Sequence, residues 1–245
     1  MQDHGSGLAV SGFQSALLFE TPEEIYARVF REFHPRTPLP AFAVEFCRFA
    51  NADSFICMES GAIHVRISDL LEAAPAPVAE ALAYILLGKL FRRPAARIYS
   101  YRYRLYLNRR DVRRQMHLIR QIRGRKFVSG PQGSYYNLET VFEALNAEHF
   151  QSMLARPQLG WSRGASRNRL GHFDPSHNAI IISRIFDDPA VPVLALEYVM
   201  FHEMLHLRFP VEHHGARRRV HTREFHQAEK QFVKLKEAKE VLKKL

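Results

Sequence analysis

The sequence is poor in cysteine and has no long hydrophobic run, and each shortage excludes a class of protein. Among 245 residues there are 2 cysteines. Cys47 and Cys57 are too few for a disulfide framework or a four-thiolate zinc site, so we expect core thiols in a reducing compartment. The most apolar helix-like run, 81–91, has about 11 residues and contains Lys89, whereas a membrane span needs about 20. We therefore expect no membrane-spanning segment.

The first residues do not have the pattern of a secretory signal. An acidic residue, Asp3, stands where such a signal has Lys or Arg, and no small-residue cleavage site follows a long apolar stretch. We therefore expect a cytoplasmic protein with an N-terminal tail over 1–20. Hydrophobic residues make up 47% of the chain and charged residues 24%, which excludes a disordered chain and predicts a folded core.

The positive charge is concentrated in one segment. Lys and Arg number 35 against 25 Asp and Glu, a net charge of +10. Residues 92–126 hold 13 of these basic residues and one acid, Asp111, so the segment carries +12 and the rest of the chain −2. Four tyrosines accompany them. Because arginine binds phosphate and tyrosine stacks on bases, the segment is a candidate DNA surface; a solvated helix face with an acidic protein partner is the alternative.

Two patterns succeed each other within this basic segment. Alternating Tyr and Arg over 99–110 predict a strand with one aromatic face. From residue 111 onward, Val112, Met116, Ile119 and Ile122 recur at helical spacing, which predicts a helix whose arginines face outward. The candidate nucleic-acid contacts are Arg102, Arg104, Arg109, Arg110, Arg113, Arg114, Arg120, Arg123, Arg125 and Lys126.

A metal-binding pattern lies in the C-terminal half, where residues 202–206 read His-Glu-Met-Leu-His. The surrounding residues favour a helix between Pro192 and Pro210. On a helix, two imidazoles at i and i+4 share one face and can hold Zn²⁺. The intervening Glu203 is then placed to take a proton from a zinc-bound water.

A third ligand is needed, and the downstream candidates are Glu212, His213, His214, His221, Glu224 and His226. His221 is the best of them, because it precedes a helical run in which Phe225 and Phe232 can face the core. We expect His172, His213 and His214 to line the cleft. Glu224 is a candidate for orienting a ligand imidazole.

These residues resemble the SprT-like metalloprotease family, which includes bacterial SprT proteins and eukaryotic Spartan proteases. The resemblance rests on HEMLH, fourteen further residues and then HTREF, and on an upstream helix at 138–150, Trp161 and two strands with a turn at Asp174-Pro175. It covers about 137–235. Val220 stands where the family often has Gly, and the cysteine-rich zinc ribbon of many members is missing.

The resemblance implies an α+β, zincin-like fold and a zinc-dependent endopeptidase of gluzincin-like mechanism. It also suggests protein substrates bound or crosslinked to DNA. We expect the peptide to extend along a strand edge at 170–173 or 179–183. A non-catalytic, zinc-stabilised DNA-binding module and a peptidase with no nucleic-acid role are the alternatives, and the oligomeric state stays open.

The two halves of the chain also resemble each other. A lead helix, a short antiparallel meander and a second helix are expected in both 21–106 and 137–245, joined by a basic helix and linker at 107–136. This suggests a tandem duplication whose first copy is a degenerate zincin-like subdomain. In that alignment Gly88, Lys89, Arg92 and Tyr99 stand opposite the metal-site residues. A packing helix is expected over 232–245.

Overall fold

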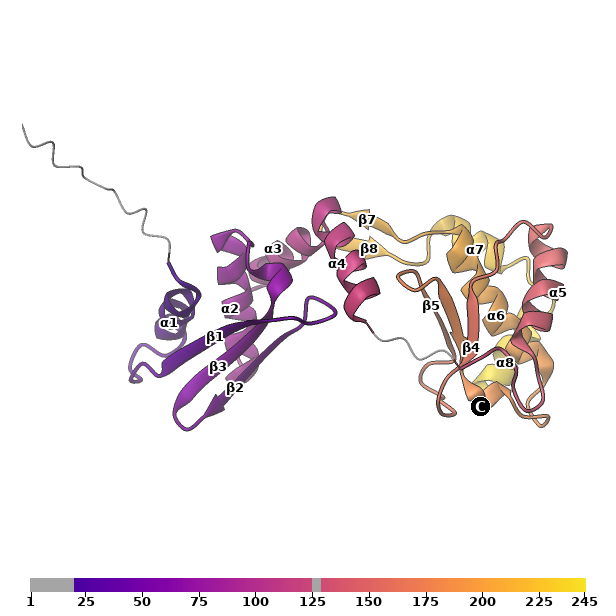
Figure 1. Ribbon diagram of the computed structural model, residues 1–245, viewed down its shortest axis with the longest axis horizontal. Coiled ribbons are helices and arrows are strands. Elements are labelled where there is room, and N and C mark those ends of the chain that lie inside the picture. Colours follow the sequence, from indigo (N-terminus) through magenta and orange to yellow (C-terminus); the bar gives the residue numbers. More distant parts are fainter. Residues whose placement is uncertain (1–19, 125–128) are drawn as a thin grey trace, which may run out of the picture.

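The computed structural model describes residues 20–124 and 129–245, and over these the chain has the predicted mixed α+β fold. Two units follow each other along the chain and lie at opposite ends of the molecule (Figure 1). The elements of the N-terminal unit are α1 (Pro22–Phe33), β1 (Ala41–Cys47), β2 (Ser54–Glu59), β3 (Ala62–Ser68), a 3-10 turn (Asp69–Leu71), α2 (Ala76–Leu90) and α3 (Arg97–Leu107).

Helix α4 (Arg110–Arg123) stands between the two units. The elements of the C-terminal unit are α5 (Leu138–Phe150), β4 (Gln158–Trp161), β5 (Gly171–Asp174), β6 (Ala179–Ile182), a 3-10 turn (Arg184–Phe186), α6 (Val193–Arg208), β7 (Glu212–His214), β8 (Arg217–Arg219), α7 (Arg223–Glu229) and α8 (Leu235–Lys244). The helices predicted at 138–150 and after Pro192 and the strand turn at Asp174-Pro175 are confirmed. Among the described residues, every helix is too short or too polar to span a bilayer.

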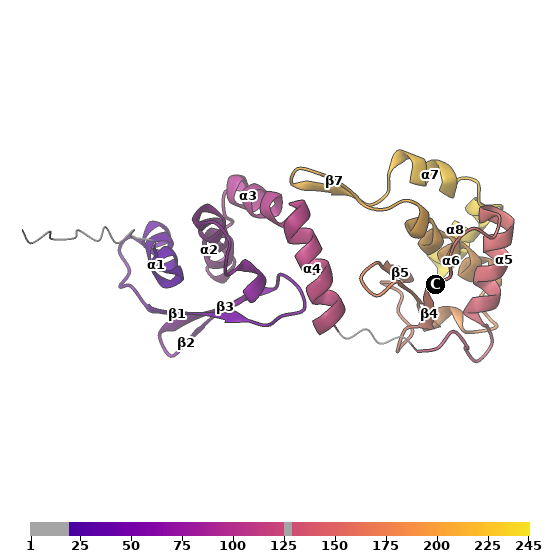
Figure 2. The same ribbon diagram turned by 45° about the horizontal axis from the view of Figure 1, so that its top comes forward.

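Each unit has its own hydrophobic core. In the N-terminal unit α1 and α2 cover one face of the sheet (Figure 2), and residues such as Val29, Val65 and Leu87 are fully buried between them. In the C-terminal unit α5, α6 and β6 meet around residues such as Phe142 and Ile180. The two clusters share no residue, so each unit buries its apolar surface independently.

The two sheets have the same topology, and it is not the predicted antiparallel meander. The strand orders are β1-β3-β2 and β4-β6-β5. In each sheet the first strand pairs in parallel with the third, and the second pairs antiparallel with the third. The third strand is therefore central, because the chain leaves the first strand, crosses to the far edge and returns between them. A 3-10 turn and a long helix follow in both units.

The shared topology changes the alignment of α2 with α6. Pro75 precedes α2 and Pro192 precedes α6 as the N-cap residue. In this register all eight buried residues of α2 fall opposite buried residues of α6. The predicted register was wrong by three residues: Ile85, Leu86 and Lys89 stand opposite His202, Glu203 and His206. The N-terminal unit still has no metal ligand at these three positions, because the alkyl side chains of Ile85 and Leu86 and the ammonium group of Lys89 cannot replace an imidazole or a carboxylate.

The predicted strand at 99–110 was wrong, because Arg97–Leu107 forms helix α3. Tyr99, Tyr103 and Tyr106 are four and three residues apart, so they share one helical face, and all three pack against the N-terminal core. Tyr99 stacks on Tyr84 with ring centroids 3.8 Å apart. The alternation of Tyr and Arg fits both the two-residue period of a strand and the spacing of a helix, and packing against α2 selected the helix.

Helix α4, by contrast, lies where the sequence predicted a helix, but its apolar residues do not all face the core. Val112 is buried, whereas Ile122 is 82% exposed. Both units bond to this helix: Arg123 pairs with Asp69 at 2.7 Å, and Arg120 pairs with Asp174 at 3.4 Å. Arg123 of α4 therefore pairs with the N-terminal unit and Arg120 with the C-terminal unit.

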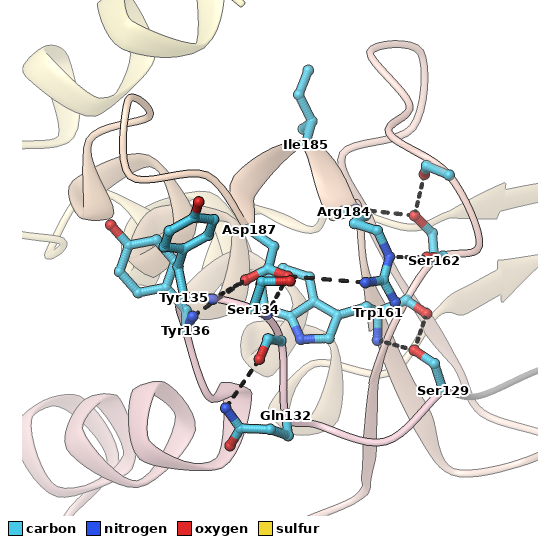
Figure 3. Close-up of polar contacts among 12 residues, drawn as sticks. Ser129, Gln132, Ser134, Tyr135, Tyr136, Trp161, Ser162, Arg184, Ile185 and Asp187 are labelled. Atoms are coloured by element: carbon cyan, nitrogen blue, oxygen red, sulfur yellow. Dashed lines mark hydrogen bonds and ion pairs between the residues drawn. The ribbon is translucent and has the colours of Figure 1, made fainter.

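A strap of residues 129–136 ties the start of the C-terminal unit to its sheet (Figure 3). The Asp187 carboxylate accepts the N–H groups of Ser134, Tyr135 and Tyr136 at 2.7, 2.9 and 3.2 Å. Trp161, which is fully buried, donates its indole N–H to the Pro131 carbonyl at 3.0 Å. The strap thus holds β4 and the turn before α6 in place.

Both cysteines are free thiols. The expectation that both lie in the core was wrong. Cys57 is exposed and Cys47 is half-buried. Cys57 pairs across the strand with His64, whose neighbours Ile63 and Val65 face the helices, so it lies on the sheet face that α1 and α2 leave uncovered.

Candidate metal centre

Three histidines from two parts of the chain meet beside α6. His202 and His206 lie one turn apart on that helix and are half-buried. His221 directly precedes Thr222, the N-cap residue of α7, whose side chain accepts the Phe225 N–H at 3.2 Å. This cap fixes the direction in which the chain enters α7 and so places His221 opposite α6.

The three imidazoles form a nearly equilateral triangle. Their ring centroids are 5.2 Å (His202–His206), 5.0 Å (His202–His221) and 5.1 Å (His206–His221) apart. One ligand atom from each lies within 4.8 Å of the others, so the cluster could bind a metal ion. The three ligands predicted from the sequence are therefore brought together.

Phe225 forms the floor of this cluster. Its ring centroid lies 5.1, 4.8 and 4.6 Å from those of His202, His206 and His221, and its side chain is fully buried. Burial, followed by the charges of His202 and His221, lowers the pKa of His206 to about 4. A neutral imidazole is the form that donates a lone pair to a metal, so three nitrogen donors in this environment fit a borderline-soft divalent ion.

Glu203 projects from α6 toward β5. Its side chain is almost fully buried, and this burial raises the pKa of Glu203 to about 7, although the backbone N–H of Phe173 acts in the opposite direction. A Cβ on Gly171 would stand 3.0 Å from Glu203 Oε1. Glu203 is therefore a carboxylate in a dry site beside the strand, with a pKa suited to proton transfer near neutrality.

A carboxylate that the sequence did not single out lies behind His202. Glu229 Oε1 is 2.9 Å from His202 Nδ1 and accepts the Tyr198 hydroxyl at 3.0 Å. Burial raises the pKa of Glu229, but the hydrogen bonds from His202 and Tyr198 outweigh it and the net shift is downward. The prediction that Glu224 orients a ligand imidazole was wrong, because Glu224 is exposed and forms a hydrogen bond with Thr222.

The strand order decides which segment can present an edge to a peptide. β6 is the central strand, so the predicted edge at 179–183 was wrong. β5 is an edge strand, and its residues 171–173 fall within the other predicted segment. Because Ser183 N donates to Leu170 O, and hydrogen-bonded pairs alternate along an antiparallel ladder, Gly171 and Phe173 direct their backbone groups away from β6.

The three histidines predicted to line the cleft lie apart from the cluster. His172 pairs with Ile181 within the sheet, and strand alternation places its side chain on the face opposite to Gly171 and Glu203. His213 and His214 belong to the β7–β8 hairpin, which extends toward α3 and α4 (Figures 1 and 2). Burial, followed by the charges of Arg113 and Arg218, lowers the pKa of His213.

Most of the arginines predicted to contact DNA are engaged within the protein. Arg102 pairs with Glu80 at 3.3 Å, and Arg109 with Asp111 at 2.8 Å. Arg113 donates to the Asn108 carbonyl, and Arg120 and Arg123 hold the two units as described above. Among the described residues, the exposed members of the set without an acidic partner are Arg104, Arg110 and Arg114, while Arg125 and Lys126 lie outside the described residues.

A second group of arginines gathers where the hairpin meets α3. The Asn108 side chain donates to Gly215 O at 2.9 Å, at the hairpin turn. Two adjoining hollows of 460 and 440 Å³ lie along this seam. Their basic lining residues are Arg97, Arg104, Arg217 and Arg218. The residues of β8 were not part of the predicted surface, although the run of three arginines at 217–219 was a signal for them.

No protein-family model, curated protein or solved structure matches the chain.

Proposed function

We propose that this protein is a zinc-dependent endopeptidase with a zincin-like C-terminal unit, in which His202, His206 and His221 bind the metal. The observation that carries the proposal is the triangle of imidazoles beside a buried glutamate. A structural zinc site normally has four protein ligands, whereas three histidines leave a position for water or substrate. Zinc bound there would polarise a water molecule and the substrate carbonyl.

The residues of the chain divide the remaining tasks. Glu203, with a pKa of about 7, takes a proton from the attacking water and passes it to the departing amine. Gly171 permits α6 to approach the strand, because any side chain there would touch Glu203. Phe225 excludes water from beneath the imidazoles.

The edge of β5 supports an extended protein or peptide substrate. Gly171 and Phe173 turn backbone groups outward next to Glu203, and the Phe173 N–H bonds to Glu203 itself, so a peptide pairing with the remaining groups of β5 would run past the general base. Such main-chain pairing is largely independent of side-chain sequence. An endopeptidase that cleaves many different proteins is therefore favoured over one with a narrow sequence preference.

The test is a comparison of Glu203→Gln with the wild type. Purified protein is analysed for zinc by mass spectrometry, and cleavage of an unfolded protein substrate is followed by gel. We expect about one zinc per chain in both proteins, and loss of cleavage in the variant by a factor of about 100 or more. Glu197→Gln is the matched control, since Glu197 lies on the same helix and is half-buried.

Retained cleavage by Glu203→Gln would overturn the catalytic role. Zinc binding without any cleavage by the wild type would favour the non-catalytic, zinc-stabilised module instead. Absence of zinc from the wild type would exclude both.

The seam between α3 and the hairpin supports a nucleic-acid surface, as expected for substrates bound or crosslinked to DNA. The arginines of the seam are Arg97, Arg104, Arg217 and Arg218. None of them has an acidic partner within the described part of the chain. Tyr101, also in the lining, is 49% exposed. Guanidinium groups without an acidic partner, gathered around an exposed ring, suit the phosphates and bases of a single strand.

Salt dependence tests this surface. We expect the double variant Arg104→Ala/Arg217→Ala to bind a fluorescent single-stranded DNA more weakly, with the slope of log affinity against log salt reduced by about 1.4 for two lost phosphate contacts. Arg109→Ala, whose guanidinium is paired with Asp111, is the control and should change little. Binding of polyglutamate with equal affinity would favour an acidic protein partner, and no binding of either would favour a peptidase without a nucleic-acid role.

Two further parts of the proposal concern location and origin. The free thiols are consistent with a cytoplasmic protein. The matching sheet topologies and the aligned burial of α2 and α6 support a tandem duplication in which the first copy lost its metal ligands.

A further inference from the structure

Glu229 is a buried carboxylate surrounded by donors from three helices. It is 8% exposed and lies at the end of α7. Tyr198 and His202 approach it from α6, and Lys239 approaches from α8 with its Nζ 3.6 Å from Oε2. His226, on α7 itself, has its Nδ1 3.7 Å from the same oxygen. A buried acid is normally paired, and this one is paired on both oxygens.

The contacts assign the proton on His202. The Tyr198 hydroxyl and the Lys239 ammonium group both donate toward Glu229, which favours its ionised form. An ionised carboxylate can only accept hydrogen bonds, so the 2.9 Å contact requires a proton on His202 Nδ1. In a neutral imidazole the other nitrogen, Nε2, is then the one with a free lone pair.

That assignment agrees with the cluster. The nitrogens of His206 and His221 that approach each other, at 3.3 Å, are both Nε2 atoms. With a proton on Nδ1 of His202, its Nε2 keeps the lone pair that can bind a metal, so all three histidines present an Nε2 atom. Without a fixed acceptor behind it, the ring of His202 would be able to adopt either tautomer and to rotate.

We propose that Glu229 is the positioning residue of the metal centre, holding the Nδ1–H of His202 so that Nε2 faces the other two histidines. Tyr198 and Lys239 support it, the first by a second hydrogen bond to the same oxygen and the second by its charge. The Nζ atom of Lys239 also lies 5.6 Å from the centroid of the Tyr198 ring, so α8 contacts both Glu229 and Tyr198. The inference rests on the proposed metal site.

The first test reads the tautomer in the metal-free protein. Nitrogen NMR of protein labelled at histidine distinguishes Nδ1–H from Nε2–H imidazoles, and a His202→Gln spectrum assigns the signal. We expect a single Nδ1–H form for His202 in the wild type and a mixture of tautomers in Glu229→Ala. Gln227→Ala, on the same helix but exposed, should keep the wild-type signal. A single Nδ1–H form in Glu229→Ala would overturn the inference.

The second test measures zinc affinity by competition with a chelator. Removal of a carboxylate behind a ligand imidazole weakens metal binding by about 10–100-fold, so we expect this loss in Glu229→Ala and a smaller one in Glu229→Gln, which keeps an acceptor oxygen. Gln227→Ala should bind as the wild type does. If Glu229→Ala does not fold, the Glu229→Gln protein alone decides.

The outcomes separate this inference from the proposed function. Wild-type protein that binds no zinc refutes the metal site itself. Wild-type protein that binds zinc, together with Glu229 variants of equal affinity and an unchanged tautomer, refutes the positioning role and leaves the metal site standing.

Discussion

The close approach of α6 to β5 makes Gly171→Ala a demanding test of the site. A Cβ at this position would lie 2.8 Å from Val199 Cγ1, 3.0 Å from Glu203 Oε1 and 3.1 Å from Glu203 Cγ. Carbon atoms in contact are normally about 3.5–4.0 Å apart, so the helix or the strand must move by about 1 Å. The backbone of Gly171 lies outside the left-handed region, so alanine at this position adds no backbone strain and its only cost is the steric crowding.

The crowding acts on stability and on activity in different proportions. Overpacking a close contact costs about 1–3 kcal/mol, which corresponds to a lower Tm by about 2–4 °C per kcal/mol for a chain of this size. A displacement of about 1 Å in a catalytic group can reduce the rate by about 100-fold. We therefore expect a folded protein with normal zinc content and a kcat/KM that is lower by one to two orders of magnitude.

The assay combines thermal unfolding with cleavage kinetics at a temperature below the transition. Gly164→Ala is the control, because its Cβ would meet no atom within 4 Å. That variant should keep its activity and gain up to about 1 kcal/mol from the loss of freedom in the unfolded chain. A Gly171→Ala enzyme with wild-type kcat/KM would refute the reasoning that Glu203 acts from the position described.

Three further predictions concern parts of the chain outside the triangle. Asp187 has a lowered pKa because its backbone N–H donors outweigh the effect of burial. Its contribution to the free energy of unfolding is therefore complete above pH about 4 and is lost as the pH falls through the lowered pKa. Asp187→Asn should reduce this loss of stability at acid pH in unfolding experiments, and an unchanged pH dependence would contradict the prediction. Phe225→Ala should reduce the free energy of unfolding by about 3–5 kcal/mol and weaken zinc binding, as measured by denaturant titration and chelator competition; a loss below 1 kcal/mol would show that the ring is not the floor of the cluster. Arg123→Ala should increase hydrogen exchange in α4 by releasing its contact with Asp69, whereas Arg110→Ala, which removes an exposed side chain, should leave the exchange unchanged.

Local patterns were enough to predict the histidines of the cluster and several elements. His202, Glu203 and His206 follow from spacing, because an α-helix places i and i+4 on one face whatever surrounds it. The helix at 138–150 and the turn at Asp174-Pro175 follow from capping, periodicity and proline. His221 was found by combining its distance along the chain with the helical run behind it, and the structure places it in the triangle.

Other features depended on packing. The segment containing Tyr99 fits both a strand and a helix, and contact with α2 selected the helix. The parallel pairing of β4 with β6 joins segments about 20 residues apart, and no local signal distinguishes it from a meander. For the same reason the sequence could not show that 179–183 is central and that β5 provides the edge.

The sequence by itself predicted the three histidines of the cluster, Glu203 between two of them and the location of the positive charge, because residue type and spacing along the chain indicate each of these. Only the tertiary structure decided what surrounds them. It placed Glu229, 27 residues after His202, behind that imidazole, and it paired Arg120 and Arg123 of α4 with acids of the two units. Which side chain meets which across a fold is set by the packing of whole elements, and that information is distributed over the entire chain.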